Sequence, residues 1–162
     1  MTPSAHTTLT AATARKTPAP DAIALLKADH ALVHGLFDEY SQARSPSRKQ
    51  ALILQLCAEL SVHMQLEEEI LYPAVVTLKT QPLLVPEASV EHAGIKDLIA
   101  QLENTDADTP LVDAQVKVLS EYVRHHVEEE HTSMFPLITA SSIDTKALGQ
   151  RMAARKRELL SL

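Results

Sequence analysis

The sequence is poor in several residue types on which many folds depend. Its 162 residues include no tryptophan, one cysteine and three glycines, and aromatic residues make up 3% of the chain. The single cysteine excludes an internal disulfide and a cysteine-based zinc knuckle. The chain also has no run of about 18 apolar residues, so no transmembrane helix is expected and a membrane is not an expected partner. The core must therefore consist mainly of aliphatic side chains.

An excess of basic residues is also missing. Fifteen Lys and Arg residues stand against 21 Asp and Glu residues, which gives a net charge of −6. Because nucleic-acid binding usually requires a basic face, this balance disfavours a nucleic-acid partner. A mean hydropathy of −0.06 is typical of soluble globular chains. The simplest expected compartment is the cytoplasm.

Long segments rich in Ala, Leu, Glu, Lys and Gln predict an all-α protein. Apolar residues recur at helical spacing over five segments, and Pro, Ser and Thr mark the breaks between them. The predicted helices cover residues 21–43, 46–77, 86–104, 110–139 and 142–160. Short loops predict that the first four form an up-down-up-down four-helix bundle over residues 21–140. Residues 1–20 are predicted to be a flexible N-terminal tail, and residues 141–162 a C-terminal, amphipathic and basic extra helix.

An eleven-residue pattern occurs twice along the chain. HMQLEEEILYP begins at His63 and HVEEEHTSMFP begins at His126, so corresponding positions differ by 63. Each copy reads His-x-x-x-Glu and ends in an apolar residue, an aromatic residue and proline. Helical residues four apart lie about 6 Å apart along the axis and on one face, so their side chains can reach the same metal ion or two adjacent ions. The closing proline predicts that each helix kinks or ends there.

Polar side chains interrupt the apolar stripe of every bundle helix. A single histidine on such a stripe is more often a hydrogen-bonded core residue than a ligand. Several buried together without partners would cost a few kcal/mol each, and metal ions would remove that cost. Imidazole and carboxylate without thiolate suit iron or manganese, and also zinc. The candidate metal ligands are His30, His63, Glu67, His92, His126 and Glu130.

Over residues 21–138 the chain resembles the hemerythrin-like (HHE cation-binding) family. The resemblance is carried by LKADH ending at His30, by the two His-x-x-x-Glu copies, and by Glu91-His92. It implies a four-helix bundle that holds two iron ions as a non-haem di-iron centre, with the six candidate ligands around them. It also implies a role in O2 binding, redox chemistry or iron sensing.

One position departs from the family members that carry O2. Lys96 stands where they have a second histidine on the third helix, so the second iron would lack an imidazole unless another residue completes the site, and the resemblance does not extend to reversible O2 carriage. Several residues are candidates for this role, although each is also typical of a solvated surface: His34, Glu68, Glu91 and His131. The aromatic residues Tyr72 and Phe135 are predicted to pack, Cys57 to lie in the core, and His125 to flank the ligands.

Three functions are compatible with these residues. The first is binding or sensing, in which the di-iron centre takes up O2, a small diatomic molecule or peroxide, or reports iron, without turnover. The second is a di-iron redox enzyme that acts on peroxide, O2 or nitric oxide. The third is a structural bundle stabilised by a metal such as zinc. We prefer the first, because no acid–base groups are evident beyond the ligands, and no feature of the sequence identifies a protein partner.

Overall fold

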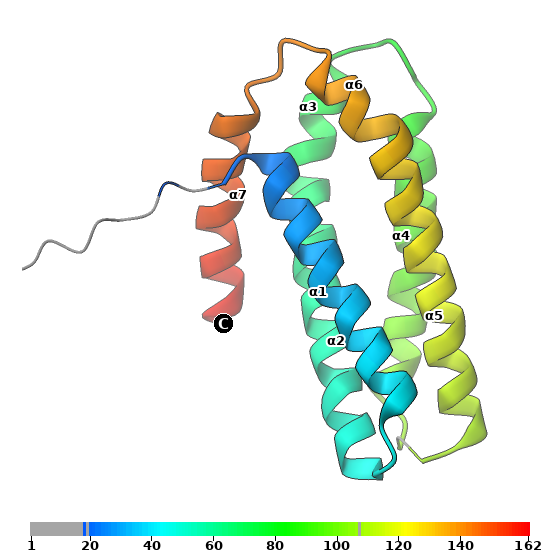
Figure 1. The fold of residues 1–162 in the computed structure, drawn as a ribbon. Helices are drawn as coiled ribbons and strands as arrows, with labels where there is room; N and C mark the ends of the chain where they lie inside the picture. The colour runs from blue at the N-terminus through cyan, green and yellow to red at the C-terminus, as the bar shows by residue number, and fades with distance from the viewer. Residues whose placement is uncertain (1–17, 19, 107) are drawn as a thin grey trace, which may run out of the picture.

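The computed structural model describes residue 18, residues 20–106 and residues 108–162, and within these ranges it is helical without strands. Four long helices run side by side in alternating directions (Figure 1): α1 (Ala22–Gln42), α2 (Pro46–Leu66), α4 (Leu84–Leu102) and α5 (Pro110–Glu129). The predicted up-down-up-down bundle is confirmed. No helix within the described residues is long and apolar enough to cross a membrane.

Side-chain caps fix where the helices begin. Ser45 accepts from the backbone N–H of Arg48 at the start of α2, and Thr109 does the same for Val112 at the start of α5. A proline follows each cap at the first helical position, where its missing N–H has no cost. Both starts were predicted from the sequence, whereas α4 begins two residues before the predicted residue 86.

The two helices that carry the His-x-x-x-Glu copies neither end nor break at their prolines. A π-helical turn, η1 (Glu67–Leu71), joins α2 to α3 (Tyr72–Val76), and η2 (Glu130–Met134) joins α5 to α6 (Phe135–Thr139). A proline clashes with the carbonyl four residues earlier in an α-helix, and a wider turn relieves that clash. The predicted helices over 46–77 and 110–139 are therefore continuous, and each widens just before its proline.

The core has two apolar layers separated by a polar one. One layer surrounds Leu56 and Leu119 near the α1–α2 and α4–α5 turns, and the other surrounds Leu71 and Phe135 at the opposite end. Between the layers lie the buried histidines and glutamates of the bundle helices. Cys57 belongs to the first layer, as predicted, and so lies away from those polar groups.

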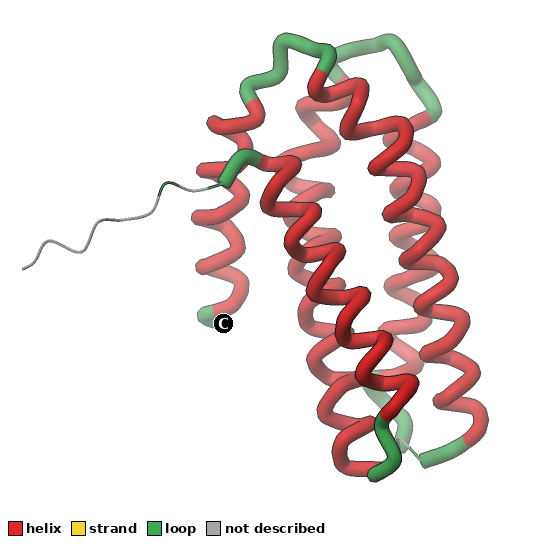
Figure 2. The backbone as a smooth tube through the Cα atoms, in the orientation of Figure 1, coloured by secondary structure: helices red, strands yellow, loops and turns green. Residues whose placement is uncertain are grey.

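The fifth helix, α7 (Thr145–Leu160), packs against α1 and α2 outside the four-helix bundle (Figures 1 and 2). It begins at residue 145 rather than 142, because Asp144 caps it by accepting from the backbone of Lys146 and Ala147. Gly149 allows this close packing, since a Cβ there would lie 2.2 Å from the carbonyl oxygen of Pro20. The predicted N-terminal tail, residues 1–20, lies almost entirely outside the described residues.

Candidate metal centre

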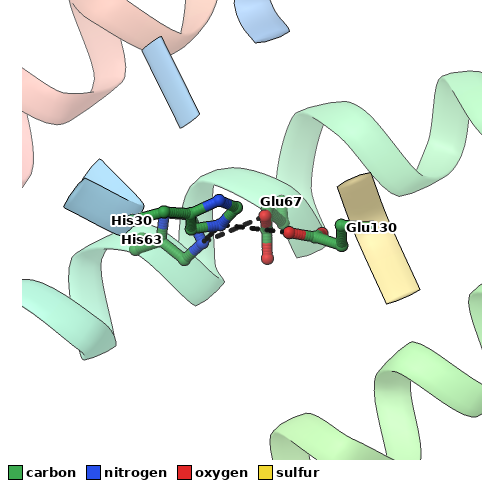
Figure 3. A group of neighbouring side chains, drawn as sticks. All are labelled: His30, His63, Glu67 and Glu130. Carbon is green, nitrogen blue, oxygen red and sulfur yellow. Dashed lines mark hydrogen bonds and ion pairs between the residues drawn. The ribbon is translucent and has the colours of Figure 1, made fainter. Parts of the chain in front are cut away.

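The six candidate ligands meet in the polar layer, and all six are at least 92% buried. They come from all four long helices and from the first residue of each π turn. Figure 3 shows His30 and His63 on one side of Glu67, with Glu130 reaching toward the same point from the opposite side. The structure therefore brings together all six of the main candidate ligands.

Glu67 lies between two pairs of imidazoles. Its Oε1 is 3.1 Å from Nε2 of His63, and its Oε2 is 3.1 Å from Nε2 of His92. The Nε2 atoms within each pair are also 3.1 Å apart, for His30 with His63 and for His92 with His126. Each oxygen of this one carboxylate thus faces a different pair of nitrogens.

Glu130 spans the same two pairs from the other half of the bundle. Its Oε2 is 3.1 Å from Nε2 of His30, and its Oε1 is 3.6 Å from Nε2 of His126. We call the space between His30, His63 and the two carboxylates the first position, and the space beside His92, His126 and Glu67 the second position. Within each group the donor atoms lie within 4.8 Å of one another.

The Nδ1 atom of each of three ligand histidines faces a carboxylate. Because a carboxylate can only accept, the Nδ1 carries the hydrogen, and in a neutral imidazole the lone pair then lies on Nε2 and points into the site. This is the tautomer that binds metal. The three pairs are His63 with Asp29 at 3.4 Å, His92 with Glu68 at 2.9 Å, and His126 with Glu91 at 2.7 Å.

The fourth histidine has an imidazole as its partner. Nδ1 of His30 is 2.9 Å from Nε2 of His131. His131 occupies in the second repeat the place that Glu68 occupies in the first, and each orients a ligand histidine of the other half. The sequence allowed Glu68, His131 and Glu91 as further metal ligands. In the structure they instead contact the Nδ1 atoms of the ligand histidines, outside the donor set.

Charges inside the cluster shift its protonation equilibria. Burial lowers the pKa of His63 and of His126, but Glu67 and the other neighbouring carboxylates outweigh it and raise both values to about 10. Burial opposes the ionisation of Glu67, yet the charge of His63 and hydrogen bonds from the surrounding imidazoles hold its pKa well below the usual range. Without metal, protons supply the positive charge that this carboxylate requires.

Two groups of the cluster are pushed toward their neutral forms. Burial, with the charge of His63, lowers the pKa of His30 to about 3. Burial and the charge of Glu67 raise the pKa of Glu130 well above its usual range. Oε1 of Glu67 and both oxygens of Glu130 are buried without an aligned hydrogen-bond donor. A cation between these oxygens and the imidazole nitrogens would satisfy them.

Other residues that the sequence raised lie outside the donor cluster. The side chain of His34 is 79% exposed and pairs with Asp38, so His34 does not complete the site. Lys96 donates to Glu68 and so stabilises the partner of His92. His125 flanks the site as predicted, with its Nε2 3.1 Å from Glu91.

The structure adds three contacts that sequence reasoning missed. Asp29 holds His63, and Lys156 of α7 donates to the same carboxylate, which connects the extra helix to a ligand. Tyr72 was predicted only to pack, but its hydroxyl lies 3.1 Å from Nε2 of His92. Asp29 directly precedes His30 and Glu91 directly precedes His92, so the sequence could have indicated these carboxylates as partners of the ligand histidines. The contact of Lys156 could not be predicted in this way, because it depends on how α7 packs.

Two clefts lead from the surface toward the cluster. One, of about 540 Å³, is lined by residues of α4 and α5 and reaches His126 and Glu130. The other, also about 540 Å³, is lined by residues of α1 and α5 and reaches His30 and His131. A small molecule thus has a route to the edge of each position.

Comparison with known proteins gives the same identification. The chain is 28% identical over 137 residues to a protein of Nostoc sp. (strain PCC 7120 / SAG 25.82 / UTEX 2576) called DNA nickase. The match covers 83% of this chain and 39% of that relative. The crystal structure of a hemerythrin HHE cation-binding domain-containing protein from Mycobacterium kansasii superposes with a TM-score of 0.75 at 26% identity, covering 88% of each chain. The family model Hemerythrin HHE cation binding domain matches residues 21–138, and the chain belongs to that family.

Proposed function

We propose that this chain is a non-haem di-iron protein that binds O2 or a related small oxidant, or senses iron, without turnover. The observation that carries the proposal is the geometry of Glu67, whose two oxygens each face a separate pair of imidazole nitrogens. Two adjacent cations that shared this carboxylate would satisfy the geometry. When bound, the two ions would supply reversible redox chemistry and a place for an external ligand.

The donor chemistry supports iron. Each position has two imidazoles and carboxylate oxygen, and the single cysteine of the chain lies in the apolar layer. Such a set suits iron or manganese, and also zinc, because it combines imidazole with carboxylate and contains no thiolate. His30 and His63 would hold the first ion, His92 and His126 the second, and the two glutamates would be shared.

Metal analysis with optical spectroscopy tests the proposal. Protein purified from its own host is expected to contain two irons per chain and to change its absorption when O2, azide or peroxide is added. His63→Ala is expected to lose most of the metal, whereas His34→Ala, which alters an exposed imidazole, should retain it. A colourless protein with one zinc per chain would instead select the structural function.

A redox enzyme is the second candidate, and the cleft that reaches His126 and Glu130 favours it, because substrate and product could exchange there. Many turnovers of added peroxide per di-iron centre would select the enzyme, and stoichiometric uptake would select the binding protein. The Nostoc relative is called a DNA nickase, and the part of it that aligns with this chain is 39% of its length. We keep the prediction that this acidic chain does not bind nucleic acid, and a nicking assay on supercoiled plasmid tests it.

A further inference from the structure

The two halves of the metal centre are related by the sequence repeat but differ at one buried aromatic residue. Tyr72 and Phe135 occupy the same place in the two copies, directly after the π turns, and each is 3% exposed. The ring of Phe135 stacks on His30 with centroids 6.0 Å apart, and it brings no polar atom. The corresponding ring in the first copy ends in a hydroxyl group.

That hydroxyl points into the donor cluster of the second position. The Oη of Tyr72 is 3.1 Å from Nε2 of His92 and 3.3 Å from Oε2 of Glu67. Both of these residues belong to the donor group of the second position. Three atoms at such separations from one another have the spacing of ligands around one cation.

The second position also needs another donor more than the first does. Around the first position lie two imidazoles and one oxygen from each carboxylate. At the second position Glu130 is more distant, with its Oε1 3.6 Å from His126 and outside the compact group that Glu67 forms with His92 and His126. The hydroxyl of Tyr72 lies beside two members of that compact group, His92 and Glu67.

We propose that Tyr72 is an oxygen ligand of the ion held by His92 and His126, which makes the two positions chemically different. The proposal rests on the proposed di-iron function. Phenolate oxygen is an established ligand of iron in proteins. As the ion binds, the phenol O–H bond breaks, the oxygen keeps the electron pair and the proton passes to solvent, so one proton is exchanged for one metal–oxygen bond.

The iron-loaded, air-oxidised protein tests this assignment. A phenolate bound to ferric iron is expected to give a visible charge-transfer band, and resonance Raman excitation in that band should show tyrosinate vibrations. Tyr72→Phe should abolish both signals. The variant is expected to fold, because phenylalanine already occupies the equivalent place at residue 135.

The chain has three tyrosines, which makes the controls complete. Tyr40 donates to Asp113 in the other part of the bundle, and Tyr122 is 48% exposed on α5. Tyr40→Phe and Tyr122→Phe should therefore keep the band at full intensity. Phe135→Tyr, which places a hydroxyl beside the first position, should add intensity to it.

Iron analysis separates the failure of this assignment from the failure of the proposed function. Two irons per chain without a phenolate band would overturn the role of Tyr72 and leave the di-iron function intact. A band that persists in Tyr72→Phe would overturn it as well. If the protein takes up no iron, the proposed function fails, and a zinc titration then tests the role of Tyr72 by itself. A tyrosinate signal in the ultraviolet difference spectrum that is missing from Tyr72→Phe supports Tyr72 as a metal ligand. Absence of that signal from the unaltered protein refutes it.

Discussion

Glu91→Gln is expected to weaken metal binding selectively at the second position. Oε2 of Glu91 accepts from Nδ1 of His126 at 2.7 Å, and this hydrogen bond lowers the pKa of the carboxyl, so the group is ionised at neutral pH. Glutamine has nearly the same shape and can still accept through its amide oxygen. The substitution therefore removes the negative charge behind the imidazole and leaves its orientation largely intact.

The expected loss follows from the position of that charge. Removing a hydrogen-bond partner behind a metal-bound histidine typically lowers metal affinity by about 10- to 100-fold, or about 1.4–2.7 kcal/mol. The side chain of Glu91 is 22% exposed, and water partly screens its charge, which favours the lower half of that range. The first position should keep its affinity, because Asp29 and His131 hold its histidines.

Competition with a chromophoric chelator measures the two equivalents separately. In Glu91→Gln one equivalent should bind as in the unaltered protein and the other about tenfold more weakly. Glu87→Gln, which alters an exposed carboxylate one turn earlier on α4, is the matched control and should leave both unchanged. Equal weakening of both equivalents, or of neither, would refute the assignment of Glu91 to the second position.

Protons, packing and the extra helix provide three more tests. Since the pKa values of His63 and His126 are raised to about 10, each metal equivalent displaces at least one histidine proton below that pH, and its apparent affinity should rise by at least about tenfold per pH unit between about pH 7 and pH 9; a slope near zero in a chelator competition would contradict the charged cluster. Gly149→Ala should lower the free energy of unfolding, measured in urea, by about 1–3 kcal/mol, because the added Cβ would meet the backbone of Pro20. Gly35→Ala is the control: its Cβ would have no atom within 4 Å, so the free energy of unfolding should rise by about 0.5–1 kcal/mol. Lys156→Met should weaken the first metal equivalent a few-fold in the same competition, since Asp29 loses its cation, and an unchanged affinity would separate α7 from the site.

Much of the site could be predicted because helical spacing alone determines it. His63 and Glu67 lie four apart and share a face whatever the rest of the chain does, and the second copy repeats this geometry 63 residues later. The buried stripe of each helix then aligns His30 and His92 with them. Local periodicity and one polar layer were sufficient to identify all six converging side chains.

The remaining features depend on tertiary structure. The spacing of His34 from His30 matched that of a ligand pair, but His34 lies outside the buried stripe of α1 and its side chain is 79% exposed. The prolines predicted a kink or an end, and the protein instead widens one turn before each of them. The contact of Tyr72 with His92 joins residues of two helices, so the sequence showed an aromatic residue but not where its hydroxyl lies.

The way in which the donors are shared implies that metal and fold stabilise one another. Each helical pair, α1 with α2 and α4 with α5, supplies the two imidazoles of one position, but the carboxylates cross between the pairs: Glu130 of the second half reaches His30, and Glu67 of the first half reaches His92. An ion at either position would therefore be held by both halves at once. Without ions, the carboxylate oxygens of Glu130 are buried without donors, a cost of about 1–3 kcal/mol for such a group. Binding would remove this cost and link the halves, so metal-free protein should unfold at a lower urea concentration than loaded protein, and the difference should shrink in a variant that has lost Glu67 and Glu130 together.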